Sequence, residues 1–164
     1  MKNRILITGA LGQLGEFFVK SLISNNNYVL ATDIKENKIL DCDFEYFDIL
    51  DKKRGNFLIK KHKINQIYNF AAILSAKGEQ NPLSTWEINN TGFTNIAKLC
   101  LKNNIKRIFW PSSIAVFGRN SNLNLATNDE PMLPETMYGV SKLACEKSMF
   151  YFNYKKLLDI RSIR

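Results

Sequence analysis

The chain has 164 residues, of which 45% are hydrophobic and 23% charged, and its formal net charge is +8. These values are ordinary for a soluble globular domain and exclude a disordered, collagen-like or coiled-coil chain, and no run of about 18 apolar residues predicts a transmembrane helix. We interpret the positive charge as a solvated surface; a nucleic-acid surface is the alternative, but no basic stripe is interleaved with aromatic residues. We therefore expect neither a membrane nor a nucleic acid as a partner.

Segments typical of strands and of helices alternate along the chain. Short apolar runs predict buried strands over Ile5–Thr8, Tyr28–Thr32, Phe44–Phe47, Gln66–Phe70, Ile105–Trp110 and Leu158–Ile163. Apolar residues at helical spacing predict helices over residues 13–25, 52–63, 82–103 and 137–154, and the aperiodic stretch 119–136 is expected to be a loop. In the second helix, Phe57, Leu58 and Ile64 are expected to face inward. Strand–helix alternation predicts an α/β fold with a doubly wound parallel sheet, as one domain over residues 1–164 that ends within the sixth strand.

Cysteine and histidine usage indicates a reducing compartment and no metal. The three cysteines are widely spaced and odd in number, which does not suit a disulfide framework: Cys42, Cys100 and Cys145. His62 is the single histidine, so a zinc site is not expected. The first apolar run ends at Gly9, too soon for a signal peptide. We therefore expect a cytoplasmic protein.

A glycine-rich turn with the spacing G-x-x-G-x-x-G joins the first predicted strand to the first helix. Gly9 permits the tight turn, Gly12 lets the backbone approach a phosphate, and Gly15 lets the helix lie close to the sheet. The helix N-terminus then offers unpaired N–H groups to a pyrophosphate. Asp33 ends the second strand, where a carboxylate accepts hydrogen bonds from ribose hydroxyls and repels a 2′-phosphate, so NAD is predicted. Lys35 as a phosphate contact keeps NADP as an alternative, and glycines that serve only a tight turn are a second alternative.

Tyr138 and Lys142 form the pattern Y-x-x-x-K at the start of the helix over residues 137–154. Residues four apart share one face of a helix. A nearby ammonium favours the phenolate form, which makes Tyr138 a candidate general base for a hydroxyl proton. Ser113 follows the fifth predicted strand, and ligands bind at the carboxyl ends of strands in such sheets. We predict that Ser113 holds the substrate oxygen; a chance surface pair is the alternative for Y-x-x-x-K.

Taken together, these motifs resemble those of the extended short-chain dehydrogenase/reductases. The resemblance rests on the turn 9–15, Asp33, Asn89–Gly92, Ser113, and Tyr138 with Lys142. Two narrower stretches, Asn69–Pro82 with the letters L-S-A-K-G-E and Phe109–Gly118, are similar to those of the NAD-dependent, metal-independent L-threonine 3-dehydrogenases, which are related to nucleotide-sugar epimerases. The resemblance covers about residue 3 to residue 164 and implies an NAD-binding Rossmann fold.

The resemblance also implies roles for individual residues. It assigns to NAD binding Gly9, Leu11, Gly12, Gln13, Leu14, Gly15, Asp33, Ile34, Asp48, Ile49, Ala71, Ala72, Asn89, Tyr138 and Lys142. It assigns to the substrate pocket Ser75, Gly78, Ser113 and Tyr138. The implied activity is oxidation of L-threonine to 2-amino-3-oxobutanoate, in which Ser113 orients the hydroxyl, Tyr138 takes its proton and Lys142 tunes Tyr138. The alternatives are a loop serine that caps the backbone at Ser75 and a solvated strand-end acid at Asp48.

Members of that family are about twice as long, with a C-terminal region that closes over the substrate. Because such a lid excludes water and orients the substrate, we expect weak or absent turnover from these 164 residues alone. In the family, the helices that correspond to residues 82–103 and 137–154 form a dimer, so a homodimer is expected, with core packing of the aromatic residues 149–154 as the alternative. Two other functions stay open: epimerisation or dehydration of a nucleotide sugar, and NAD binding without catalysis.

Overall fold

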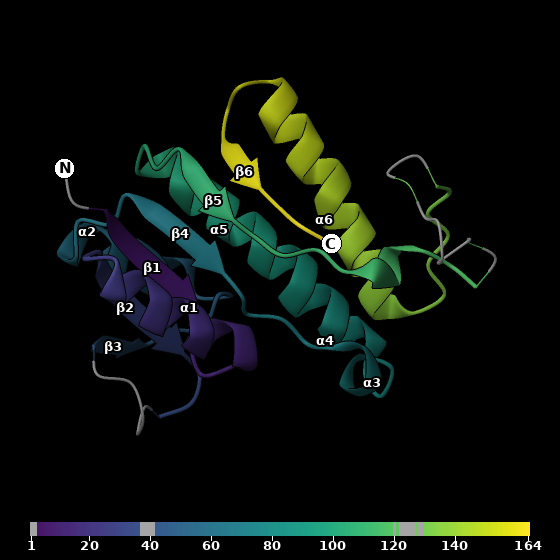
Figure 1. Ribbon diagram of the computed structural model, residues 1–164, viewed down its shortest axis with the longest axis horizontal. Helices are drawn as coiled ribbons and strands as arrows, with labels where there is room; N and C mark the ends of the chain where they lie inside the picture. Colours follow the sequence, from purple (N-terminus) through teal and green to yellow (C-terminus); the bar gives the residue numbers. More distant parts are fainter. Residues whose placement is uncertain (1–2, 37–41, 120, 122–126, 128–129) are drawn as a thin grey trace.

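Figure 1 shows a computed structural model of the chain, which describes residues 3–36, 42–119, 121, 127 and 130–164. Its strands are β1 (Arg4–Thr8), β2 (Tyr28–Asp33), β3 (Asp43–Tyr46), β4 (Gln66–Asn69), β5 (Arg107–Phe109) and β6 (Asp159–Arg161). Its longer helices are α1 (Gln13–Ser24), α2 (Lys52–Lys61), α5 (Gly92–Lys102) and α6 (Met137–Tyr154). Its short helical segments are α3 (Ser75–Gly78), α4 (Pro82–Trp86), η1 (Glu87–Thr91) and η2 (Ile114–Val116). Each predicted strand and helix is therefore found, with ends that differ by a few residues.

The strands form one six-stranded sheet in the order β3-β2-β1-β4-β5-β6, and neighbouring strands run parallel. This confirms the predicted doubly wound α/β fold, with its Rossmann strand order. The strand order reverses between β1 and β4, and the segments that follow these two strands diverge at this point. Ligands bind at such a switch point in open parallel sheets, so we expect a ligand-binding site at the carboxyl edge next to β1 and β4.

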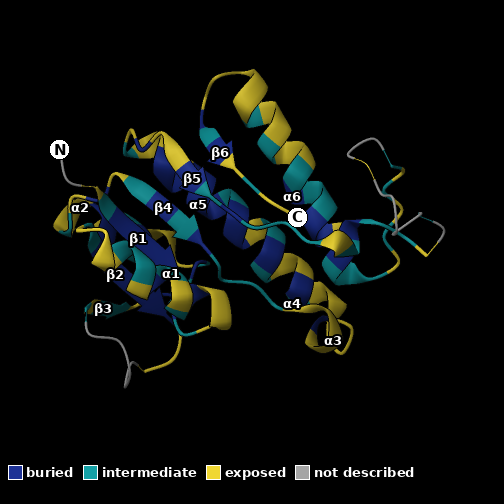
Figure 2. Cartoon of the chain, viewed as in Figure 1, coloured by how far each residue is buried: buried dark blue, intermediate teal, exposed yellow. Residues whose placement is uncertain are grey.

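Separate hydrophobic cores lie on the two faces of the sheet, because alternate strand residues point to opposite sides. On one face, Leu6, Leu30 and Ile67 pack with residues of α2, α5 and α6. On the other face, Ile5 and Ile7 pack with residues of α1. Figure 2 shows the buried central strands and the exposed outer surfaces of the helices. Burial on both faces explains the continuous apolar runs in the sequence.

The stretch expected as one helix over residues 82–103 contains a π-helical turn. It is a continuous helical run, but Glu87–Thr91 in its middle has π-helical hydrogen bonding. The buried side chain of Asn89 lies in this turn. A π turn adds one residue to a helical turn, and such turns often occur at functional sites. Apolar periodicity does not reveal it.

The prediction that Phe57 faces inward is wrong. Its side chain is 51% exposed, whereas Leu58 and Ile64 are buried as expected. Helix α2 turns the face with Leu58 toward the sheet, which leaves the preceding residue outside. The guanidinium of Arg54 lies over the Phe57 ring, 5.4 Å from its centre, so a cation covers part of the exposed ring.

Much of the loop expected over residues 119–136 lies outside the described residues. Those of its residues that are described form no helix or strand. Within the described ranges, no helix combines the length and the apolar character needed to cross a membrane.

Candidate active site

The glycine turn follows β1 and opens α1 at the carboxyl edge of the sheet. Gly9 has a φ of 64°, and a Cβ there would lie 2.7 Å from the Ala71 nitrogen. Gly15 is buried beneath the turn, where a Cβ would lie 2.2 Å from the Gly9 oxygen. At exposed Gly12 a Cβ would lie 3.3 Å from that same oxygen. Gly12 is also the N-cap of α1 and supplies no side-chain cap, so an anion suits the first N–H groups of this helix.

Asp33 ends β2 beside this turn and is 9% exposed. One carboxylate oxygen accepts a hydrogen bond from the Leu11 nitrogen at 3.1 Å, and the other accepts one from the Lys35 nitrogen at 3.2 Å. The carboxylate therefore holds the glycine turn, and its two oxygens retain lone pairs for further donors such as ribose hydroxyls. A negative charge at this place repels a 2′-phosphate, which favours NAD over NADP.

A cavity of about 420 Å³ opens at these strand ends. Its lining includes residues that the sequence predicts for the cofactor: Gly9, Leu11, Gly12, Asp33, Ile34, Asp48, Ile49, Ala71 and Ala72. Sequence reasoning missed other lining residues, most of them apolar: Phe47, Phe70, Ile73, Leu74, Lys77 and Ile88. Several of these are sequence neighbours of predicted positions, and that adjacency is the signal that could have found them. A largely apolar cleft that begins at a glycine turn and a carboxylate fits a dinucleotide.

Three of the residues predicted for the cofactor lie at the start of α1, outside the lining of this cavity. Gln13 and Leu14 are exposed in the first turn of the helix, and Gly15 is buried against the turn. Their backbone N–H groups belong to the helix N-terminus, which is the part of α1 that suits a pyrophosphate. A pyrophosphate at this place would meet these residues at the backbone of the helix start rather than at the cavity wall.

Asn89 supports the cavity from behind its wall. It is 4% exposed, and its side chain bonds both backbone groups of Ile73. The Ile73 nitrogen donates to Asn89 Oδ1 at 2.8 Å, and Asn89 Nδ2 donates to the Ile73 oxygen at 3.1 Å. The same Nδ2 donates to Ser141 Oγ at 3.0 Å, and this hydroxyl donates to the backbone carbonyl oxygen of Tyr138 at 2.7 Å. Asn89 thus joins the cavity wall to α6.

The ammonium group of Lys142 is buried where α6 packs against the chain after β5. The residue is 4% exposed, and Nζ donates to the Pro111 oxygen at 2.7 Å. Nζ also lies 4.3 Å from the centre of the Trp110 ring and 5.6 Å from that of the Tyr138 ring. Burial lowers the pKa of Lys142 to about 8, so the charged form still dominates at neutral pH. The structure therefore brings a cation next to Tyr138, as the spacing predicts.

Ser113 lies against the start of α6. A Cβ on Gly139 would lie 2.2 Å from the Ala115 oxygen, so the glycine allows the helix backbone to approach the chain after β5. Ser113 Oγ accepts a hydrogen bond from the Ala115 nitrogen at 3.2 Å. The neighbouring Ser112 hydroxyl donates to the Glu146 carboxylate on α6. These contacts hold Ser113 beside the helix that carries the tyrosine and the lysine.

Ser75 and Gly78, predicted for the substrate pocket, do not line the cavity. Ser75 is exposed at the start of α3, and Gly78 is buried against Thr85, whose hydroxyl donates to the Gly78 oxygen at 3.1 Å. Their neighbours Leu74 and Lys77 line the cavity instead. The L-S-A-K-G-E stretch therefore meets the cofactor cavity through residues other than the predicted ones.

The fold and the glycine turn define a dinucleotide-binding Rossmann protein. Its tyrosine–lysine pair and Ser113 lie outside the lining of the cavity, and Asn89 joins the cavity wall to the helix that carries the pair. Residues 5–164 match the NAD dependent epimerase/dehydratase family, and the chain belongs to that family. Its cofactor is NAD, which fits the glycine turn, the Asp33 carboxylate and the apolar cavity.

Known proteins similar to this chain carry different names. An uncharacterized epimerase/dehydratase of Staphylococcus saprophyticus is 38% identical over 169 residues, which is 99% of this chain and 52% of that protein. The structure of L-threonine dehydrogenase from Clostridium difficile is 35% identical, with a TM-score of 0.93, over 99% of this chain and 53% of that one. The GalE-like L-threonine dehydrogenase from Cupriavidus necator is 32% identical, with a TM-score of 0.94, over 98% and 54% of the two chains. The chain spans about half the length of these proteins.

Proposed function

We propose that the chain carries the NAD-binding and proton-transfer half of an L-threonine 3-dehydrogenase, an oxidoreductase. The observation that carries this proposal is the Lys142 ammonium beside the Tyr138 ring, on a helix that Asn89 joins to the wall of the NAD cavity. Likeness to structures named L-threonine dehydrogenases supports the substrate. Cytoplasmic action is part of the proposal, and the wide spacing of the cysteines supports a reducing compartment.

In the proposed reaction, the β-hydroxyl of L-threonine becomes the ketone of 2-amino-3-oxobutanoate. Ser113 holds the hydroxyl oxygen through a hydrogen bond, and Tyr138 accepts the hydroxyl proton as general base. Lys142 places its positive charge beside the Tyr138 ring and binds the nicotinamide ribose. Bound NAD would supply the oxidant, as the acceptor for the hydride of the β-carbon, so that one proton and one hydride account for the two-electron oxidation.

The test is a single-turnover assay with the chain in excess over NAD, because slow turnover is expected from these 164 residues. L-Threonine should give NADH, and Tyr138→Phe should lower the rate about 100-fold or more while it leaves NAD affinity within about twofold, since a positioned base contributes about 10²–10⁴-fold. Binding of L-threonine to the NADH-loaded chain is followed by ligand-observed NMR. If the chain forms no NADH from L-threonine and also shows no saturable L-threonine binding, the proposal is contradicted.

Epimerisation or dehydration of a nucleotide sugar is the second candidate. The observation that favours it is the name of the Staphylococcus saprophyticus relative, an uncharacterized epimerase/dehydratase at 38% identity. The same NMR experiment with UDP-glucose separates the two candidates. Saturable binding of UDP-glucose without L-threonine binding supports the second, and NAD binding without either ligand supports a non-catalytic module.

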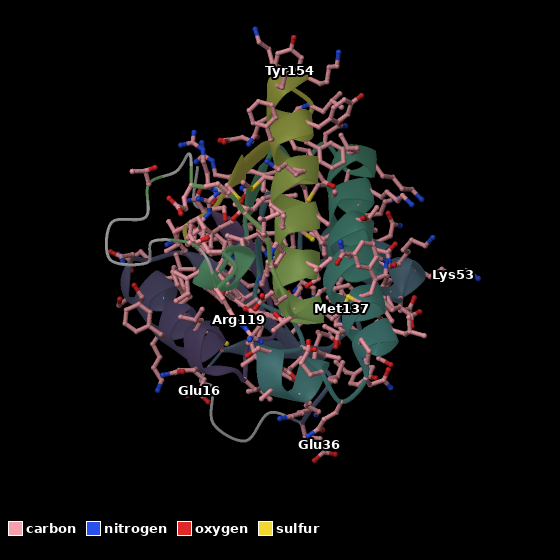
Figure 3. The ribbon with its side chains drawn as sticks, turned by 90° about the vertical axis from the view of Figure 1, so that its right-hand side faces the viewer. Glu16, Glu36, Lys53, Arg119, Met137 and Tyr154 are labelled. Carbon is pink, nitrogen blue, oxygen red and sulfur yellow. The ribbon has the colours of Figure 1, made fainter. Side chains whose placement is uncertain are left out.

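We also propose a homodimer through the outer faces of α4 and α6. Phe150 and Tyr154 are each 71% exposed, and their rings stack with centres 6.4 Å apart. On α4, Leu83 is 79% and Trp86 43% exposed. Figure 3 looks onto α6 between the labelled Met137 and Tyr154, with the helical run α4–η1–α5 beside it. These exposed apolar side chains lie on two helices that contact each other, and such exposed apolar surface favours a protein partner.

If the chain forms this homodimer, light scattering at micromolar concentration should give the molar mass of two chains. The double variant Phe150→Asp with Tyr154→Asp should give the mass of one chain, because it places two charges in the apolar face. Phe57→Asp is a matched control, since Phe57 is also exposed but lies on α2. A monomeric wild-type chain would contradict this part of the proposal.

A further inference from the structure

The carboxylate of Glu79 joins two parts of the site that are distant in the sequence. Glu79 directly follows α3, and its Oε1 accepts a hydrogen bond from the Met137 nitrogen at 2.8 Å. Met137 is the first residue of α6 and precedes Tyr138. The partners are 58 residues apart, so the contact exists only in the folded chain.

At one end of this contact lies part of the cavity wall. Leu74 and Lys77 line the cavity, and the backbone between them and Glu79 is tightly turned. The Gly78 nitrogen donates to the Leu74 oxygen at 2.7 Å, and the Glu79 nitrogen donates to the Ser75 oxygen at 3.1 Å. Because this turn is held by its own hydrogen bonds, a shift of Glu79 moves the wall residues with it.

At the other end lies the first turn of the helix that carries Tyr138. Thr136 Oγ1 accepts a hydrogen bond from the Gly139 nitrogen at 3.0 Å, and Glu79 accepts the one from Met137. These two acceptors satisfy N–H groups that a helix start leaves unpaired. A carboxylate there also interacts favourably with the positive end of the helix dipole. Tyr138 lies between the two bonded residues, so its position depends on both acceptors.

The wall is therefore joined to α6 at two places. The first is the buried Asn89 side chain, which bonds Ile73 and Ser141. The second is the exposed Glu79 side chain, which bonds Met137. A single hydrogen-bonded connection would let the wall rotate about it, whereas two connections fix both the distance and the angle between the wall and α6. The Glu79 connection meets α6 at Met137, which is nearer to Tyr138 in the sequence than Ser141, where the Asn89 connection meets it.

We propose that Glu79 is a positioning residue of the dehydrogenase reaction. It holds the wall segment Ala71–Glu79 on the first residue of α6 and so determines where the Tyr138 phenol stands relative to the NAD cavity. This inference rests on the proposed function. Such an exposed acceptor at a helix start stabilises folding only modestly, so the larger effect of Glu79 is on geometry. Small displacements of catalytic groups are costly, since rate depends steeply on their alignment.

Three variants test this role in the single-turnover assay. Glu79→Ala removes the acceptor, Glu79→Gln keeps an oxygen acceptor without the charge, and Gln80→Ala removes the adjacent exposed side chain as a control. Glu79→Ala should lower the rate of L-threonine oxidation about 10-fold, with NAD affinity within about twofold of wild type and an unfolding temperature lowered by no more than about 4 °C. Glu79→Gln should recover at least about half of the wild-type rate, and Gln80→Ala should match wild type in all three measurements.

A wild-type rate in Glu79→Ala would overturn the proposal. So would a rate loss accompanied by an equal loss of NAD affinity or of folding, because a purely structural role predicts that pattern. Failure of Glu79→Gln to recover any activity would overturn the hydrogen-bond explanation.

Hydrogen exchange at the Met137 amide separates this inference from the proposed function. Exchange should be about fivefold or more faster in Glu79→Ala than in wild type and should return toward wild type in Glu79→Gln, because the amide loses and regains its acceptor. If this pattern appears but wild type oxidises no L-threonine, the connection to α6 is supported and the proposed substrate fails. If Met137 exchange is the same in all variants, the inference fails whatever the substrate.

Discussion

Lys142→Met is expected to stabilise the protein at neutral pH while it removes hydride transfer. The wild-type side chain is 4% exposed, and burial lowers the pKa of Lys142 to about 8 from its ordinary value of 10.5. The folded chain therefore binds this proton less tightly than the unfolded chain does. The difference corresponds to about 3 kcal/mol of folding free energy that the charged lysine costs at neutral pH.

The pH dependence of this effect has a definite sign. Between about pH 8 and 10.5 the unfolded chain binds more protons at Lys142 than the folded chain, so wild-type stability rises with pH in this window. Below about pH 8 the lysine is charged in both states, and the full cost of burying the charge is present. Methionine carries no charge, so the gain from Lys142→Met is largest below this window and disappears at its upper end.

Thermal unfolding and the single-turnover assay measure the two effects. Loss of the hydrogen bond from Lys142 Nζ to the Pro111 oxygen offsets part of the gain, so we expect a net increase of about 1–3 kcal/mol, or roughly 3–8 °C. The rate of hydride transfer should fall about 100-fold or more. Lys147→Met is the control on the same helix, where the lysine is exposed, and should change neither quantity. An unfolding temperature of Lys142→Met at or below wild type would falsify the assignment of a costly buried charge.

Gly15→Ala and Gly12→Ala are expected to separate folding from cofactor binding. At Gly15 a Cβ would lie 2.2 Å from the Gly9 oxygen and 2.7 Å from the Ala10 Cα, and these backbone atoms cannot move without opening the turn. Overpacking of this kind costs about 1–3 kcal/mol or more, which exceeds the gain of roughly 1 kcal/mol from better helix propensity. Gly15→Ala should therefore lower the unfolding temperature by roughly 5 °C and also weaken NAD binding more than about 10-fold.

Gly12→Ala is the matched control because it makes the same change in the same turn. A Cβ there would lie 3.3 Å from the Gly9 oxygen, and the φ of −82° suits alanine. Its unfolding temperature should stay within about 2 °C of wild type, while NAD binding weakens about 10-fold because the methyl group meets the approaching phosphate. Thermal unfolding and NAD titration measure both variants. A wild-type unfolding temperature for Gly15→Ala, or unchanged NAD affinity for Gly12→Ala, contradicts the roles given to these glycines.

The elements that the sequence predicts correctly are those with a strong local pattern. Helix α6 has the predicted bounds, Met137–Tyr154, and the buried strands β1 and β2 differ from prediction by one residue at one end. Their signals are glycine, apolar runs and helical spacing, which act between near neighbours in the chain. The π turn Glu87–Thr91 and the outward Phe57 have no such signal, because helix packing against the sheet decides them.

The residues of the site divide in the same way. Gly9 and Asp33 can be found from the sequence, because a strand end, a tight turn and a helix start each require particular residue types at fixed spacing. Asn89 was found only as part of a resemblance, and its bonds to Ile73 and Ser141 come from the fold. Glu79 is the last residue of the L-S-A-K-G-E stretch, but the resemblance assigns it no role, and its bond to Met137 comes from the fold.

The amino-acid sequence alone determined the order of strands and helices, the parallel sheet, the glycine turn for NAD and the pairing of Tyr138 with Lys142, since all of these follow from spacing along the chain. Only the tertiary structure decided that the Lys142 charge is buried and that Glu79 and Asn89 join the cavity wall to α6. The physical reason is separation. The contacts of Lys142 with Pro111, of Asn89 with Ser141 and of Glu79 with Met137 connect residues 31, 52 and 58 positions apart, and no local pattern encodes which distant group a side chain meets when the sheet and helices pack.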